Sequence, residues 1–113
     1  MIRRATAEHY TWGQGCDGWH LVRTPELGVI QERILPNTAE VRHYHRRSRQ
    51  FFFILSGRAR LELGEEVFSL GAGDGLEVPP GTPHRIRNDA NADLEFVVVS
   101  QPHSHGDRVV LDD

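Results

Sequence analysis

The sequence predicts an all-β fold, an antiparallel barrel or sandwich, and three observations support it. Short apolar runs recur along the chain and are separated by Gly, Pro, Asn and Asp. No heptad pattern and no long run with a 3.6-residue period interrupts them. The chain has 113 residues, a length that suits one domain, and a barrel or sandwich can bury the apolar face of a sheet at this size.

Runs rich in β-branched and aromatic residues define the expected strands. They lie at residues 19–24, 29–35, 41–45, 50–56, 58–63, 66–70, 76–79, 84–88 and 94–100, with turns at 25–28, 63–66 and 89–93. The run at 51–55 lacks polar alternation, which predicts burial on both faces. A second layer or a partner subunit would then cover the outer face of that strand.

The two ends of the chain are less regular than its centre. Residues 1–18 are expected to form an extended arm with one helical turn within 5–10. The barrel would occupy about 19–100. Residues 101–113 read as a polar tail with a strand-like piece at 109–111. Together these parts are expected to make one domain over 1–113.

Composition limits the functional classes. The net charge of −3 gives no reason to expect nucleic acid as a partner. Cys16 is the single cysteine, so an intramolecular disulfide is impossible, which fits a reducing compartment. No N-terminal apolar run resembles a signal peptide, and no stretch is long enough to span a bilayer. We therefore expect a cytoplasmic protein without a membrane partner.

Three histidines and a glutamine suggest a metal site. His43 and His45 are two residues apart on an expected strand, so their side chains point to the same face. Gln50 follows on the next strand, and His84 comes from a distant one. Three imidazoles and one amide oxygen could therefore converge on one transition-metal ion.

The spacing around these residues resembles the two sequence motifs of the cupin superfamily. Every fixed position of the second motif is filled, by Gly73, Pro79, Gly81, His84 and Asn88. The first motif is matched at His43, His45 and Gly57. Asn37 replaces its leading Gly, a mild departure because Asn tolerates left-handed backbone. Gln50 replaces its metal-binding Glu, which is the more important departure.

The resemblance implies a single-domain cupin jelly-roll β-barrel that holds a divalent transition metal and frequently forms a homodimer. The expected ligands are His43, His45, Gln50 and His84, and Zn, Ni, Fe, Mn or Co would suit them. Gln50 brings no negative charge, so the ion would keep its full charge and favour an anionic ligand. Alternatively, Gln50 hydrogen-bonds His45 or fills space, which leaves three ligands.

The remaining polar residues give a weaker signal. Gln31 and Arg33 share a strand face that could line the barrel, and with Phe52 and Ile86 they form the expected substrate pocket. No catalytic acid or base is evident, and residues 97–99 are all valine. Other motifs have a plain structural interpretation: the arginines at 42, 46, 47 and 49 as a solvated rim, and the histidines at 103 and 105 as part of an exposed tail.

These features favour a metal-binding small cupin that acts as a Lewis-acid enzyme on a small polar or anionic metabolite. In size and ligand set the chain is similar to the small uronate-ring-opening cupins of pectin and alginate breakdown. A metal-dependent dioxygenase is one alternative. A non-catalytic module that binds a small molecule or sugar is another, and the lack of an evident acid or base favours it.

Overall fold

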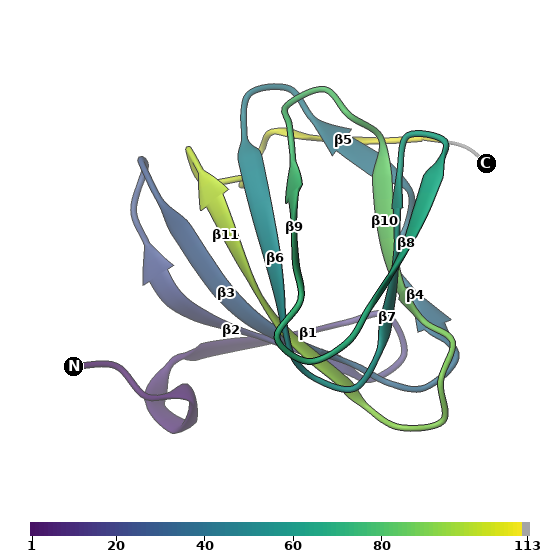
Figure 1. Cartoon of the computed structure of the whole chain (residues 1–113). Coiled ribbons are helices and arrows are strands. Elements are labelled where there is room, and N and C mark those ends of the chain that lie inside the picture. Colours follow the sequence, from purple (N-terminus) through teal and green to yellow (C-terminus); the bar gives the residue numbers. More distant parts are fainter. Residues whose placement is uncertain (112–113) are drawn as a thin grey trace.

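The computed structural model describes residues 1–111 and confirms the predicted all-β jelly roll, with two antiparallel sheets that face each other (Figure 1). One sheet has the order β1 (Glu8–Trp12), β2 (Cys16–Arg23), β3 (Gly28–Ile34), β11 (Leu94–Gln101), β6 (Arg49–Ser56) and β9 (Gly75–Val78). The other has the order β12 (Arg108–Val110), β5 (His43–His45), β10 (His84–Asn88), β7 (Ala59–Leu63) and β8 (Glu66–Leu70), and β4 (Thr38–Ala39) also pairs with β10.

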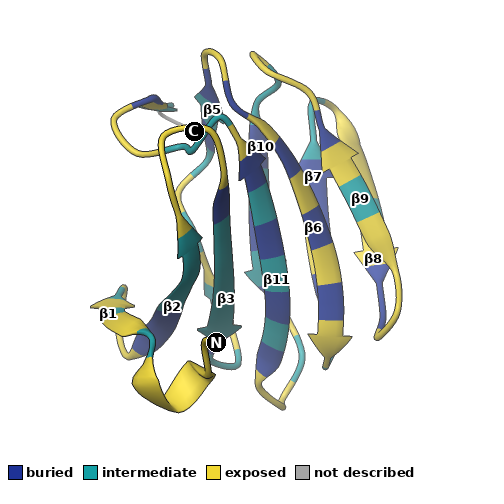
Figure 2. Ribbon diagram, turned by 90° about the vertical axis from the view of Figure 1, so that its left-hand side faces the viewer, coloured by how far each residue is buried: buried dark blue, intermediate teal, exposed yellow. Residues whose placement is uncertain are grey.

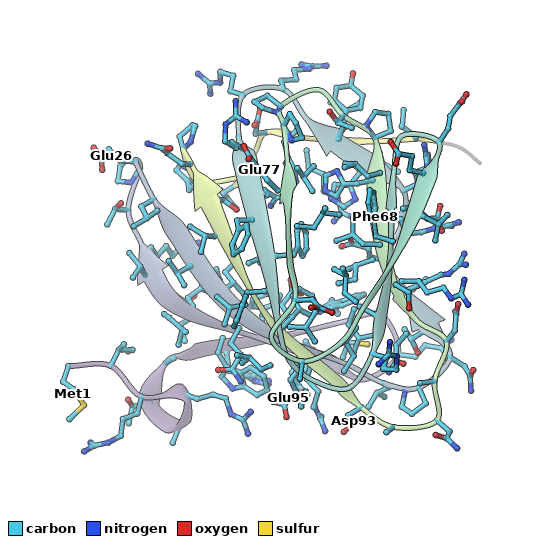
Figure 3. All side chains as sticks on the ribbon, in the orientation of Figure 1. Met1, Glu26, Phe68, Glu77, Asp93 and Glu95 are labelled. Carbon is cyan, nitrogen blue, oxygen red and sulfur yellow. The ribbon has the colours of Figure 1, made fainter. Side chains whose placement is uncertain are left out.

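The core lies between the two sheets. Side chains alternate along each strand, so every second residue of β6 and β11 is buried (Figure 2). Phe52, Ile54, Leu61, Ile86 and Phe96 form its centre. Phe68 of β8, which belongs to the second sheet, also packs against this cluster (Figure 3).

The expected strands are all present, and their ends differ by no more than a few residues. The two chain ends differ more. A short 3₁₀ helix occupies Arg4–Thr6, and β1 then pairs with β2 where an arm was expected. At the other end β12 pairs with β5, so the expected strand is confirmed one residue earlier. No helix of the described residues is long and apolar enough to cross a membrane. Residues 112 and 113 of the expected tail lie outside the described residues.

The prediction that residues 51–55 are buried on both faces is wrong for the single chain. The side chains of Phe51, Phe53 and Leu55 point outward and are 42%, 39% and 43% exposed. The alternate residues of β6 face the core, as its one-sided burial shows. These three side chains form an outer apolar stripe, and the rings of Phe51 and Phe53 stack with centroids 6.4 Å apart.

Four motif positions, Asn37, Gly57, Gly73 and Gly81, have the positive φ that their residue types favour, and two of them bear on the site. Asn37 has φ of 57°, which agrees with its place where a Gly would lead the first motif. Gly81 has φ of 78° and is the third residue of the turn 79–82, which precedes His84 on β10. The backbone conformation at these two positions therefore explains why an Asn and a Gly are found there.

Candidate metal centre

Strand pairing brings the three motif histidines together. His84 of β10 is the register partner of His43 of β5, and His45 lies two residues further along the same face of β5. The ring centroid of His84 is 4.4 Å from that of His43 and 5.6 Å from that of His45. One ring nitrogen from each histidine can be chosen so that all three lie within 4.8 Å of one another. All three residues are buried.

Two of the rings are oriented by the same local contact. Nδ1–H of His43 donates to the Val41 carbonyl at 2.7 Å, and Nδ1–H of His84 donates to the Thr82 carbonyl at 3.0 Å. Each contact reaches back two residues along the chain. Because a neutral imidazole carries one proton, Nε2 of both rings is left with a lone pair, the arrangement that metal-binding histidines use. Nδ1 of His45 is buried and has no partner within residues 1–111.

The electrostatics of the cluster keep the rings neutral. Burial is the main cause and lowers the pKa of His43 to about 3 and that of His45 to about 4. Burial also lowers the pKa of His84. The mutual repulsion of the protonated rings adds to this effect for His43 and His45. At neutral pH the three rings are thus deprotonated and able to bind a cation.

Gln50 lies beside this cluster on β6. Its amide nitrogen donates to the Ser100 hydroxyl at 3.0 Å, which turns Oε1 toward the histidines. Oε1 lies 3.1 Å from Nε2 of His84. The proton of His84 is on Nδ1, so two lone-pair atoms face each other. Three imidazole nitrogens and one amide oxygen lie close together here, and a divalent transition metal accepts this set of donors. The sequence allows a contact of Gln50 with His45, whereas in the structure Gln50 contacts His84.

A pocket of about 430 Å³ opens from the histidine cluster. His43, His45 and Gln50 form one side, and Tyr10, Trp12, Ile30, Glu32, Glu40 and Arg108 are among the residues that surround the rest. The pocket thus combines the histidine cluster with two carboxyl groups. Neither carboxyl group is evident as a catalytic acid from the sequence.

The expected substrate pocket was assigned to the wrong face of β3. Arg33 points outward and its Nε donates to Asp17 at 2.7 Å. Gln31 also points outward and donates to Glu95 at 3.4 Å, a residue labelled in Figure 3. Ile30 and Glu32 line the pocket instead. The sequence does contain a signal for the correct face. Ile30 and Ile34 are apolar and four residues apart, so they mark the inner face of β3, and Glu32 between them lies on that same face.

Phe52 and Ile86 were also expected in the substrate pocket, and neither lines it. Both are buried in the core, with 3% and 0% exposure. The Phe52 ring lies edge-on to His84 with centroids 6.0 Å apart. These residues therefore support the metal cluster from behind and offer no surface to a ligand.

Glu32 and Glu40 have different surroundings within the pocket. Burial, and next the negative charge of Glu40, raise the pKa of Glu32 to about 8. Burial raises the pKa of Glu40 to about 7, and the backbone N–H of Ile86, which donates to Glu40 at 3.1 Å, opposes this rise. The indole N–H of Trp12, which also lines the pocket, is buried and has no hydrogen-bond partner within residues 1–111. The carboxyl group of Glu40 is therefore fixed by a hydrogen bond from the backbone of β10. The carboxyl group of Glu32 is the less constrained of the two.

The arginines of the rim divide into two groups. Arg42 points away from the cluster and donates to Glu62 at 3.3 Å and to the Gly64 carbonyl at 2.9 Å. Arg49 pairs with Glu77. Arg46 and Arg47 are exposed and line a separate hollow with Asp107 and Arg108, the last of which also lines the pocket beside the histidine cluster. Of these arginines, Arg108 alone lines the pocket itself and can attract an anion into it.

Residues 31–100 match the family model described as Cupin domain, which is more than half of the chain, and the protein belongs to this family. An uncharacterized protein of Methanocaldococcus jannaschii, MJ1618, is 35% identical over 85 residues, which cover 74% of this chain and 68% of that protein.

Two further proteins show how far these similarities extend. Polyketide synthase CurC of Streptomyces cyaneus is 35% identical over 60 residues, which cover 53% of this chain and 39% of that protein. Among solved structures, KdgF from Halomonas sp. has a TM-score of 0.83 at 19% identity and covers 91% of this chain and 93% of its own. At that identity the structural similarity shows the fold alone. Family and fold thus agree on a cupin with a three-histidine cluster.

Proposed function

We propose that this protein is a metal-dependent enzyme that uses Lewis-acid chemistry on a small polar or anionic metabolite, in an isomerisation or ring-opening reaction. Glu32 supports the proposal most strongly. It lines the same pocket as His43 and His45, and its pKa of about 8 lies close to neutrality. An acid poised near the working pH can both donate and accept a proton, which is what such reactions require.

His43, His45 and His84 would hold the metal, with the Gln50 amide oxygen as the fourth ligand. Zn, Ni, Fe, Mn and Co all accept this set of donors. When bound, a divalent ion with four neutral ligands would polarise a carbonyl or hydroxyl oxygen of the substrate and stabilise negative charge on it. The fully neutral donor set favours this role over oxidative cycling, because it stabilises a higher metal charge less than a carboxylate would.

The other residues of the pocket would bind the substrate and move its protons. Glu32 in its neutral form donates a proton at near-neutral pH and takes one back in its ionised form. Glu40 raises the pKa of Glu32 by its negative charge and is itself fixed by Ile86. Arg108 brings a positive charge to the same pocket and would attract an anionic substituent. Ile30 and Val98 supply apolar walls that limit water.

Solvent-proton exchange tests this proposal. Zinc-, nickel- and manganese-loaded protein would be incubated in D₂O with a panel of sugar acids, sugars and hydroxy-carbonyl compounds, and proton NMR would follow deuterium entry beside the carbonyl. At least one compound should exchange or isomerise. Glu32→Gln should slow that exchange by about a hundredfold or more, the range for removal of a general acid or base. Its metal content should be unchanged, and Glu65→Gln in an exposed turn is the matched control.

Other outcomes would point to the alternatives. Oxygen consumption with the iron- or manganese-loaded protein would favour a dioxygenase. Saturable binding of a panel member without exchange or turnover would favour a non-catalytic binding module. If Glu32→Gln exchanges as fast as the parent, Glu32 is not the proton carrier and the proposed mechanism is wrong.

A further inference from the structure

A second hollow of about 420 Å³ adjoins the metal pocket. The two share Tyr10, Ile30, Ser104 and Arg108, so they form one continuous depression along the inner face of β1, β2 and β3. The outer hollow contains none of the histidines of the metal cluster. The function proposed above leaves this half of the depression without a role.

Tyr10 stands between the two hollows because β2 has no side chain at Gly18. Tyr10 and Gly18 are register partners, and Gly18 also pairs with Glu32 on its other side. A Cβ at Gly18 would lie 2.1 Å from Cζ and 2.4 Å from the hydroxyl oxygen of Tyr10. The phenol ring therefore lies flat across β2 toward Glu32. A larger residue at Gly18 would lift the ring into the depression.

The outer hollow is lined by cationic and hydrogen-bond-donating side chains. Three histidines face it, His20, His103 and His105, together with Arg108. Nδ1 of His103 accepts the backbone N–H of His105 at 3.2 Å, so the proton of a neutral His103 ring is on Nε2. This nitrogen is then a donor. Arg108 adds a permanent positive charge at the boundary between the two hollows.

The acidic group of this hollow is already neutralised. Glu8 lines it, and both of its carboxylate oxygens accept from the Arg23 guanidinium, at 2.8 and 2.9 Å. A single guanidinium nitrogen, Nη1 of Arg23, donates to both oxygens, so the two opposite charges are paired with each other. The positive charge of Arg108 is thus the one available to bind a ligand in this hollow, and the three imidazoles can provide further hydrogen bonds.

The loop that carries His103 is fixed against the barrel. The backbone N–H of His103 donates to the Pro25 carbonyl at 3.4 Å, and the Ser48 hydroxyl donates to the Pro102 carbonyl at 2.7 Å. The Cβ of His103 would lie 3.6 Å from a Cβ at Gly28. The expected polar tail is therefore folded onto the barrel at this point. A site whose donors are already in place loses little entropy when it binds.

We propose that the outer hollow binds an oxyanion, a phosphate or carboxylate group at the end of the metabolite remote from the histidine cluster. This inference rests on the proposed function and narrows its substrate class to metabolites with such a second group. The substrate would extend past Tyr10, with its reacting end beside Glu32 and its anionic end against His20, His103 and Arg108. Metabolites without the second anionic group would bind more weakly.

Binding of inorganic phosphate and of acetate to the metal-free protein tests the inference separately from catalysis. Long-range proton–nitrogen NMR spectra of the histidine rings would be recorded at increasing concentrations of each anion. One of the two should shift the signals of His20, His103 and His105 in the millimolar range. The signals of His9, which lies outside both hollows and contacts Asp17 at 2.7 Å, should stay unchanged.

A double variant, His20→Asn with His103→Asn, supplies the second measurement. It should weaken binding of the preferred anion by at least about tenfold, because each hydrogen bond to a charged group contributes to affinity. His9→Asn is the matched control and should bind as the parent does. Preference for phosphate over acetate, or the reverse, would identify the anionic group.

Two results would overturn the inference. One is the absence of any shift at the three rings of the outer hollow with either anion. The other is equal affinity in the parent and the double variant. Both measurements use metal-free protein and no turnover, so they can fail while the exchange reaction at Glu32 is still observed. Unchanged zinc content of the double variant would show that its barrel is intact.

Discussion

Oε1 of Gln50 and Nε2 of His84 face each other at 3.1 Å, and the His84 proton is bound elsewhere. The Gln50 amide nitrogen donates to the Ser100 hydroxyl, and in this orientation Oε1 is the amide atom that faces His84. Both atoms thus present lone pairs to the same point. This is the relationship expected of two neighbouring ligands of one ion, and it supports Gln50 as a ligand more than as a spacer.

The ligand role of Gln50 can be tested by changing its charge. Gln50→Glu should hold or raise metal affinity, because a carboxylate is the stronger ligand, and should lower the acidity of bound water and the affinity for anions. Gln50→Ala should weaken metal binding. Ligand-field spectra of the cobalt-substituted parent and the two variants provide the measurement. Identical bands in all three proteins would exclude Gln50 from the coordination sphere.

The histidine cluster should bind about one transition-metal ion per chain, as expected for one convergent set of ligands. His45→Ala combined with His84→Ala removes two of its three imidazoles and should abolish binding. Elemental analysis after dialysis measures this. His103→Ala combined with His105→Ala removes as many histidines from outside the cluster and should leave the stoichiometry unchanged. Equal metal content in both double variants would mean that the site is misassigned.

Asn88, the last fixed residue of the second motif, has a structural role. It is fully buried, its amide nitrogen donates to the carbonyls of Ile34 and Ala92, and its oxygen accepts from Ala90. Asn88→Ala should lower the free energy of unfolding by about 2–4 kcal/mol, because buried groups lose their partners.

Urea unfolding measures the effect of Asn88→Ala. Asn91→Ala, in the exposed turn that follows β10, is the control and is expected within about 0.5 kcal/mol of the parent. Metal stoichiometry should be normal in both variants. A stable Asn88→Ala protein that had lost its metal would contradict the structural role.

Strand positions and the histidine cluster could be predicted from sequence because they depend on local signals. Turn residues limit the strands, and the spacing of His43 and His45 sets their common face. The inner face of β3 is hard to predict from sequence because the strand has charged residues on both faces. Arg33 points outward and Glu32 points inward. Which of them is buried depends on partners far away in the chain, such as Asp17 for Arg33.

The C-terminal segment was underestimated for a similar reason. Its residues are polar, and polarity alone predicts a solvated tail. What holds it is the pairing of Arg108 with His45 in β12 and β5, and the carboxylate of Asp107, which accepts the backbone N–H of Ser48 at 2.8 Å. Contacts between residues this far apart leave no periodic pattern, so the segment's part in both hollows emerges only from the folded chain.

We infer that the protein is a homodimer in solution and that the outer apolar stripe of Phe51, Phe53 and Leu55 lies in the interface. An exposed row of large apolar side chains on a sheet is typical of a surface that a partner covers. Phe53→Arg should convert the dimer to a monomer, because a charge there would be buried without a partner. Analytical ultracentrifugation at micromolar concentration measures this.

Val67 supplies the control for the dimer prediction. It is 53% exposed on β8, in the opposite sheet, so Val67→Arg adds the same charge away from the stripe. This variant should sediment as the parent does. A monomeric parent would count decisively against the dimer. Dissociation by both substitutions would place the interface elsewhere.

Glu32 should make the stability of the metal-free protein depend on pH. Its pKa is raised from 4.5 to about 8 in the folded protein, so the folded state binds a proton that the unfolded state has released between these values. This contribution to stability is complete below pH 4.5 and is lost as the pH rises through 8. Glu32→Gln cannot ionise and should not suffer this loss.

The comparison is therefore the difference in urea midpoint between Glu32→Gln and the parent, measured from pH 5 to pH 8.5 without metal. It should increase with pH in favour of the variant, by on the order of 1 kcal/mol, since solvent screens the partly exposed carboxyl. Glu26→Gln, in an exposed turn labelled in Figure 3, is the matched control and should show no such trend. A difference that stays constant across this range would mean that Glu32 is ionised in the folded protein at neutral pH, and it could then serve only as a base.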